Sequence, residues 1–198
     1  VVSIISPISI FFSFILNSSF GLIIVIYFLF NILYSFKLKN IIILDIIIIS
    51  LGFVLRVLGG GILVNIHSSP WVIITTFCLA MFLSCSKRRT ELELIQNKEI
   101  NKVNQRETLN EYTIELIDKF LVIMASGSII SYAIYSASDY AYDKFHTYNL
   151  IYTTIFVING IFRYYYLIMI RKIGLQVNDI ILHDLPFIMN IIAWICTT

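Results

Sequence analysis

The residues that suggest chemistry are polar and charged side chains inside or beside strongly apolar segments. Tyr34 and Lys39 lie where one apolar segment ends, and Asp45 and Arg56 lie within the next. A charge within a membrane span is costly and usually faces a protein interior or a water-filled cavity. We therefore predict a polar pocket for phosphate groups at the membrane surface. In it, Asp45 is the catalytic carboxylate, and Tyr34, Lys39 and Arg56 bind phosphate.

Asp45 and Arg56 are eleven residues apart. In a helix this separation is about 16 Å along the axis, which is too long for a direct ion pair. We therefore expect each side chain to have a partner of its own. The alternative is structural: lysines that extend to the membrane surface, and a buried Asp45–Arg56 pair that this spacing argues against.

A second basic group, Lys87, Arg88 and Arg89 with Glu91 close behind, follows a later apolar segment. Arginine presents a fork that matches phosphate oxygens, and lysine acts as a point charge. The same three bases also suit an anchor on anionic lipid headgroups, and their spacing alone does not separate these roles. Arg163, in a tyrosine-rich stretch, either extends to the membrane surface or points into the same pocket.

Composition places the whole chain in the membrane class. Of its 198 residues, 59% are hydrophobic and only 13% are charged, and the mean hydropathy is +0.88. Soluble domains carry about 25% charged residues. Cys78, Cys85 and Cys196 lie in or beside apolar segments without metal-ligand spacing, so we expect them to be packing residues. The chain starts with Val1 and shows no signal-peptide pattern, which favours a fragment of a longer protein.

The apolar segments are long and have few turn signals, which favours helices over buried strands. We predict an all-α membrane bundle, a single domain over residues 1–198, with a charged loop at 87–114. The expected spans share an apolar composition and are separated by polar breaks; they cover residues 2–16, 20–36, 41–63, 70–86, 115–136, 149–170 and 185–197.

The basic residues predict an orientation in a cell membrane. Ten of the fourteen fall on three alternate breaks: Lys37, Lys39, Lys87, Arg88, Arg89, Lys98, Lys102, Arg106, Arg171 and Lys172. Loops rich in lysine and arginine stay in the cytoplasm. We therefore expect these three loops to be cytoplasmic in a multi-pass inner-membrane protein. No pattern indicates a nucleic-acid partner, and the oligomeric state stays open.

A series of motifs in order along the chain resembles a known family. They are Tyr-Ser-Phe-x-Leu-Lys (34–39), Asp45, Gly-Phe-Val-Leu-Arg (52–56), Gly-Gly (60–61), Ser-Pro-Trp (69–71), Lys-Arg-Arg-x-Glu (87–91), Tyr112, Leu-Ile-Asp (116–118) and Phe-Arg-Tyr (162–164). The series resembles the decaprenyl-phosphate phosphoribosyltransferases of the UbiA-type membrane prenyltransferase superfamily. Aromatic prenyltransferases of that superfamily carry an aspartate-rich motif where this chain has Lys-Arg-Arg-x-Glu, which points to the phosphoribosyl branch.

The resemblance implies a nine-helix bundle, of which this chain supplies about seven. It implies transfer of 5-phosphoribosyl from phosphoribosyl pyrophosphate to a polyprenyl phosphate in the bilayer, with release of pyrophosphate. Mg²⁺ and a basic cluster would stabilise the charge that develops. Asp45 and Glu91 are the acids placed near the expected pocket, and Glu91 is a weak candidate metal ligand.

The chain departs from the family in one respect. Family members carry an Asn-Asp-x-x-Asp-x-x-x-Asp motif between their second and third spans, and this motif is absent here. We therefore expect residues 1–198 alone to show no transfer unless an N-terminal helix pair with that motif is added. The alternatives are an inactive remnant or a partner subunit, and a transporter. A transporter would favour an internal repeat and charges near the membrane midplane, and the sequence shows no repeat.

Overall fold

The computed structural model describes residues 2–96, 109, 111–171 and 184–198, and all its regular elements there are helices. In chain order these are α1 (Val2–Leu16), α2 (Ser18–Phe36), η1 (Leu38–Asn40), α3 (Leu44–Leu63), α4 (Pro70–Gln96), α5 (Ile114–Ser136), α6 (Asp139–Phe145), η4 (Asn149–Thr153), α7 (Thr154–Arg171) and α9 (Leu185–Thr197). The predicted all-α fold is confirmed.

Side chains at the helix starts explain several boundaries. The Asn17 side chain accepts hydrogen bonds from the first backbone N–H groups of α2, and Thr113 does the same for α5. Asp184 caps α9 in this way, and Pro70 opens α4. Such caps satisfy N–H groups that have no partner within the helix. The polar breaks predicted from sequence therefore act as helix starts.

Five of the described helical segments have the length and apolar character to cross a membrane: Ser18–Phe36, Leu44–Leu63, Pro70–Gln96, Ile114–Ser136 and Asn149–Ile170. The segments Ile5–Leu16 and Leu185–Thr197 are apolar but shorter. All seven predicted spans are therefore helices, and five reach spanning length. The chain is a multi-pass membrane protein.

Two of the polar segments that were expected to separate the spans contain helix in the structure. The charged loop was expected to begin at residue 87, but α4 continues to Gln96. Ion pairs from Arg88 and Arg89 to acids one turn further along explain why this polar stretch stays helical. The break at 138–148 contains the short helix α6. Residues 97–108 and 172–183, which hold the other expected loop lysines and Arg106, lie outside the described residues.

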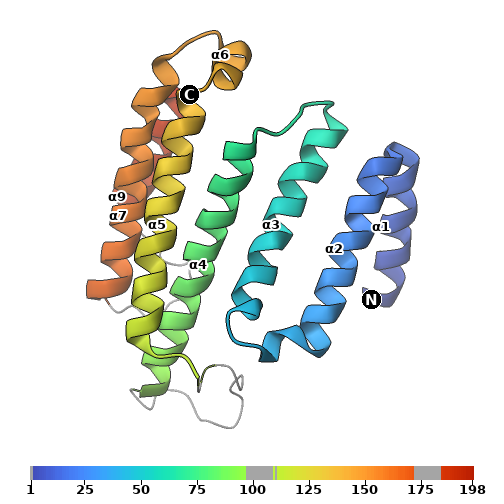
Figure 1. Cartoon of the computed structure of the whole chain (residues 1–198), viewed down its shortest axis with the longest axis horizontal. Helices are drawn as coiled ribbons and strands as arrows, with labels where there is room; N and C mark the ends of the chain where they lie inside the picture. Colours follow the sequence, from blue (N-terminus) through green and yellow to red (C-terminus); the bar gives the residue numbers. More distant parts are fainter. Residues whose placement is uncertain (1, 97–108, 110, 172–183) are drawn as a thin grey trace.

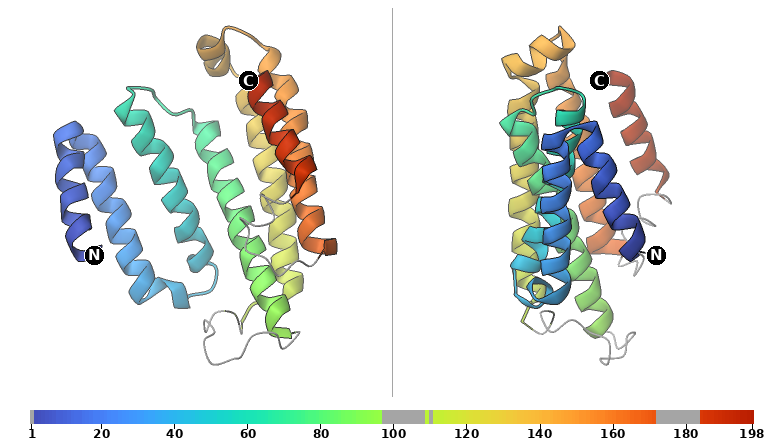
Figure 2. Two further views of the ribbon diagram at one scale, coloured as in Figure 1. Left: turned by 180° about the vertical axis from the view of Figure 1, so that it is seen from behind. Right: turned by 90° about the vertical axis from the view of Figure 1, so that its right-hand side faces the viewer.

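The long helices stand side by side in a row that runs from α1 through α2, α3, α4 and α5 to the α7–α9 pair (Figure 1). Successive helices alternate in direction, and the edge-on view in Figure 2 shows that the row is thin compared with its width in Figure 1. The α2–α3 connection, the C-terminal end of α4 and the N-terminal end of α5 share one end, the lower end in Figure 1. We call this the basic end, because Lys39 and Lys87–Arg89 belong to these elements.

The apolar core lies toward α4, α5 and α7. Its most buried members include Phe82, Cys85, Ile117, Leu121 and Leu167. By contrast, α1 and α2 expose many large apolar side chains, as expected of helices that face lipid or other membrane helices. The tightly packed half of the molecule is therefore the half in which α4 carries Arg88 and Arg89.

Candidate functional site

The candidate site is built around Asp45, which lies in the first turn of α3 and is fully buried. The hydroxyl of Tyr112 donates a hydrogen bond of 2.8 Å to Asp45 Oδ1. The same hydroxyl accepts a bond of 2.7 Å from the backbone N–H of Ile43. Tyr112 thereby ties the segment that precedes α5 to the start of α3. Burial and the nearby Asp45 raise the pKa of Tyr112 above its usual value, so Tyr112 stays a proton donor at neutral pH.

The backbone that leads into this turn is strained. Ile43 has a φ of 68°, in the left-handed region that branched side chains rarely adopt. Such a conformation costs on the order of 1–3 kcal/mol and persists only where its surroundings impose it. Here the N–H of Ile43 is held by Tyr112, and its carbonyl accepts from the N–H groups of Ile46 and Ile47 in the first turn of α3. The strain is therefore localised where Asp45 is positioned.

Arg88 connects α4 to Asp45 on α3. Its side chain is 1% exposed, and Arg88 Nη1 pairs with Glu91 Oε2 on the next turn. Arg88 Nε lies 3.7 Å from Asp45 Oδ2, which is an ion-pair distance but too long for a hydrogen bond. Within the described part of the chain, neither Arg88 Nε nor Asp45 Oδ2 has a hydrogen-bond partner. A free donor and a free acceptor therefore face each other in a buried position.

Arg89 joins α4 to α5. Its Nε donates a hydrogen bond of 2.7 Å to Asp118 Oδ1, and its Nη1 lies 2.7 Å from Glu93 Oε1. The two buried guanidinium groups thus face four carboxylates. We call this set the ionic network; its members are Asp45, Arg88, Arg89, Glu91, Glu93, Asp118 and the hydrogen-bonded Tyr112.

The predicted phosphate-binding residues have different surroundings in the described structure. Arg88 and Arg89 lie in the ionic network, whereas Lys87 is exposed beside them. Tyr34 and Lys39 are half-buried near the α2–α3 connection. These positions leave the predicted roles in phosphate binding and catalysis untested, and they show that both arginines already have carboxylate partners.

Arg56 and Arg163 have hydrogen-bond partners outside the network. Arg56 Nη2 donates a hydrogen bond of 2.6 Å to the hydroxyl of Tyr27 on α2. Arg163 binds Asp184 through two hydrogen bonds, of 3.0 and 2.9 Å, and so links α7 to the start of α9. The expectation that Asp45 and Arg56 have separate partners is confirmed.

Sequence reasoning left out several partners. Glu93 stands one turn after Arg89, and that four-residue spacing could have identified it. Asp118 and Asp184 are 29 and 21 residues from the arginines that they bind, so no local pattern pairs them.

The described acids do not fit a magnesium site. Mg²⁺ prefers carboxylate oxygens, substrate phosphates and several waters in an octahedron. Among the described residues, no group of three or more His, Cys, Asp and Glu side chains could hold a metal ion. Asp45 Oδ1 accepts a hydrogen bond from Tyr112, and Asp45 Oδ2 faces Arg88 Nε. Glu91 forms an ion pair with Arg88. The contact that the structure gives Glu91 is thus with an arginine.

An apolar cavity of about 560 Å³ lies among α4, α5, α7 and α9. Its wall includes Phe82, Leu83, Tyr164 and Trp194. The hydroxyl of Ser128, also on the wall, is buried without a hydrogen-bond partner in the described chain. A cavity of this size is typical of sites for small molecules or part of a lipid chain.

The cavity and the ionic network are neighbours along α4. Phe82 lines the cavity, and the hydroxyl of Ser86, one turn further on, lies 3.0 Å from the hydroxyl of Tyr164. Arg89 follows on the same face of α4, about 10 Å from Phe82 along the axis, whereas Arg88 points toward Asp45 on α3. A molecule with an apolar tail and an anionic head matches this order of surfaces.

Comparison with known proteins supports the resemblance. The chain is 26% identical over 123 residues to a decaprenyl-phosphate phosphoribosyltransferase of Mycolicibacterium smegmatis, which is 62% of this chain and 38% of that protein. The Corynebacterium glutamicum protein of the same name is 28% identical over 102 residues, 52% of this chain and 30% of the relative. A protein of the same name from Mycobacterium tuberculosis is 23% identical over 121 residues, which is 61% of this chain and 39% of that protein.

No family model matches the chain. The matches cover about a third of the length of these curated relatives. Within that length they confirm the resemblance that the motifs indicated: this membrane chain is similar to part of the decaprenyl-phosphate phosphoribosyltransferases.

Proposed function

We propose that the chain forms part of a membrane transferase that moves 5-phosphoribosyl from phosphoribosyl pyrophosphate to a polyprenyl phosphate. The observation that carries the proposal is the similarity to four proteins named decaprenyl-phosphate phosphoribosyltransferase. The arrangement along α4 supports it, because an apolar cavity adjoins a pair of arginines at the basic end.

The reaction makes a simple demand on the protein. A phosphate oxygen of the acceptor attacks C1 of the ribose, the C1–O bond to pyrophosphate breaks, and pyrophosphate leaves with the electron pair. The apolar cavity would hold part of the isoprenoid tail and keep it away from water. The phosphate head would then lie toward Ser86 and the arginines. The proposal assigns no step to Mg²⁺, because the described acids do not fit it.

Arg88 has a carboxylate partner that a phosphate could replace. Its partner Glu91 is 28% exposed and can leave, while Asp45 and Tyr112 are fixed in the core. Exchange of Glu91 for a substrate phosphate would keep the guanidinium paired throughout. Asp45 would then act as a positioning residue that fixes Arg88.

The test is lipid labelling. Membranes that contain residues 1–198 joined to a family-type N-terminal helix pair with the aspartate motif would be given radiolabelled phosphoribosyl pyrophosphate and decaprenyl phosphate, and the lipid extract would be counted. We expect acceptor-dependent label in the lipid phase, reduced at least tenfold by Arg88→Gln. Lys119→Gln is the control, because Lys119 is 67% exposed at the start of α5 and has no predicted role in the site, so this variant should retain activity. No labelled lipid, in membranes where the protein is present and folded, would favour the inactive or partner-subunit alternative.

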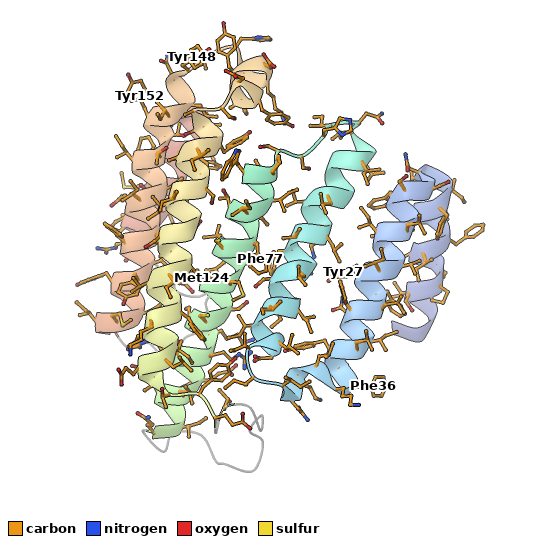
Figure 3. The ribbon with its side chains drawn as sticks, viewed as in Figure 1. Tyr27, Phe36, Phe77, Met124, Tyr148 and Tyr152 are labelled. Carbon is orange, nitrogen blue, oxygen red and sulfur yellow. The ribbon has the colours of Figure 1, made fainter. Side chains whose placement is uncertain are left out.

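The proposal includes an orientation, with the basic end in the cytoplasm of a cell membrane. In a background without native cysteines, Lys39→Cys at this end and Tyr148→Cys at the opposite end (Figure 3) should label from opposite sides. A membrane-impermeant maleimide added to intact cells should reach only the cysteine at position 148. Labelling of position 39 from outside would reverse the orientation.

A further inference from the structure

Arg56 lies near the middle of the membrane. It stands at the thirteenth of the twenty positions of α3, Leu44–Leu63. A helix of this length spans about 30 Å, the thickness of the hydrocarbon core, so the Cα of Arg56 lies about 4 Å from the midplane. Its partner Tyr27 is the central residue of α2, and Figure 3 shows Tyr27 at mid-height between α2 and α3.

The side chain of Arg56 is exposed and has no charged partner among the described residues. Its guanidinium lies over the rings of Tyr27 and Phe53, at 5.2 and 4.9 Å from their centroids. The ion pairs of the described chain do not include it. Its one hydrogen bond there goes to the hydroxyl of Tyr27, and no described group accepts the proton of that hydroxyl. The other guanidinium N–H groups and the Tyr27 proton therefore have no acceptor among the described residues.

Side chains on a helix lean toward its N-terminus, which directs Arg56 along α3 toward the midplane. An intramembrane arginine usually pairs with an acid, with backbone carbonyls or with water in a cavity. Phosphate headgroups lie at the membrane surfaces, about 15 Å away. A carboxylate offers about four acceptor positions, which suits the guanidinium N–H groups and the Tyr27 proton together.

We propose that the Arg56–Tyr27 face of α2 and α3 docks a further membrane helix that carries an aspartate or glutamate at mid-depth. The acid pairs with Arg56 and accepts the proton of Tyr27. The apolar side chains around the pair then pack against the incoming helix. The proposal does not depend on the reaction that the protein catalyses.

The test is photocrosslinking in membranes. A benzophenone amino acid at Phe53, which is 41% exposed beside Arg56, should crosslink to a membrane helix with an acid within one turn of the adduct. The matched control is the same probe at Phe162, which is 64% exposed on α7. Adding Arg56→Gln to the Phe53 probe should lower the yield roughly tenfold, which is about 1.4 kcal/mol.

Swapping the charges of Arg56 and its partner acid tests whether the crosslink depends on this ion pair or only on the two helices being close. Arg56→Glu should abolish the adduct, and changing the identified acid to arginine in the same cells should restore it. Adducts only to lipid, to polyprenyl phosphate, or to a helix without an acid would overturn the proposal. Unchanged yield with Arg56→Gln would also overturn it.

Discussion

Asp45 offers a sharp test of the ionic network, because it contacts two other elements of the fold from a fully buried position. Asp45→Ala removes the hydrogen bond from Tyr112 and leaves Arg88 Nε without its carboxylate. Removing one member of a buried ion pair costs about 3–5 kcal/mol. Arg88 keeps Glu91, so we expect a loss of about 3 kcal/mol in the free energy of unfolding, at the lower end of that range.

Two further variants separate the charge from the hydrogen bond. Tyr112→Phe removes the bond to Asp45 and leaves the Ile43 N–H without an acceptor, which should cost about 1–3 kcal/mol. Combining it with Asp45→Ala should cost less than the sum, with a coupling of about 0.5–3 kcal/mol, because both changes break the same bond. Asp45→Asn keeps an acceptor for Tyr112 and removes the charge, so its loss should lie between those of Asp45→Ala and wild type.

The assay is equilibrium unfolding in mixed micelles with increasing SDS, read by a thiol-reactive dye. Cys85 is fully buried in the same core and reports its opening, and Cys196→Ser removes an exposed background thiol. Ser50→Ala is the control, because Ser50 is equally buried on α3 but bonds only a carbonyl one turn back. Equal losses for Asp45→Ala and Ser50→Ala would refute the claim that the network joins α3 to α4.

Two further predictions use the same assay. Gly61→Ala should destabilise the α3–α4 connection by about 1–3 kcal/mol, because the new Cβ would stand 2.8 Å from the carbonyl oxygen of Ile66. Gly60→Ala meets no atom within 4 Å and should be neutral or stabilising, and a loss as large as that of Gly61→Ala would contradict the steric argument. Arg163→Gln should lower the unfolding midpoint by breaking both bonds to Asp184, and an unchanged midpoint would show that this pair does not hold α9.

The positions of the helices followed from local sequence. Each predicted span became a helix, because long apolar runs must satisfy their backbone groups internally in a membrane. Polar residues such as Asn17 and Thr113 marked the starts, because they cap the exposed N–H groups. The extension of α4 to Gln96 was missed, because the charges after residue 87 suggested solvent rather than ion pairs along one helix.

Sequence by itself also determined which charges require partners, since Asp45, Arg56 and Arg88 stand in or beside apolar helices. Only the tertiary structure decided what those partners are. Asp45 meets a tyrosine 67 residues away and Arg89 an aspartate 29 residues away, while Arg56 meets a tyrosine instead of an acid. Any buried arginine attracts any carboxylate, so charge alone does not choose among them. The choice is made by helix packing, which brings one carboxylate within bonding distance and holds the others apart.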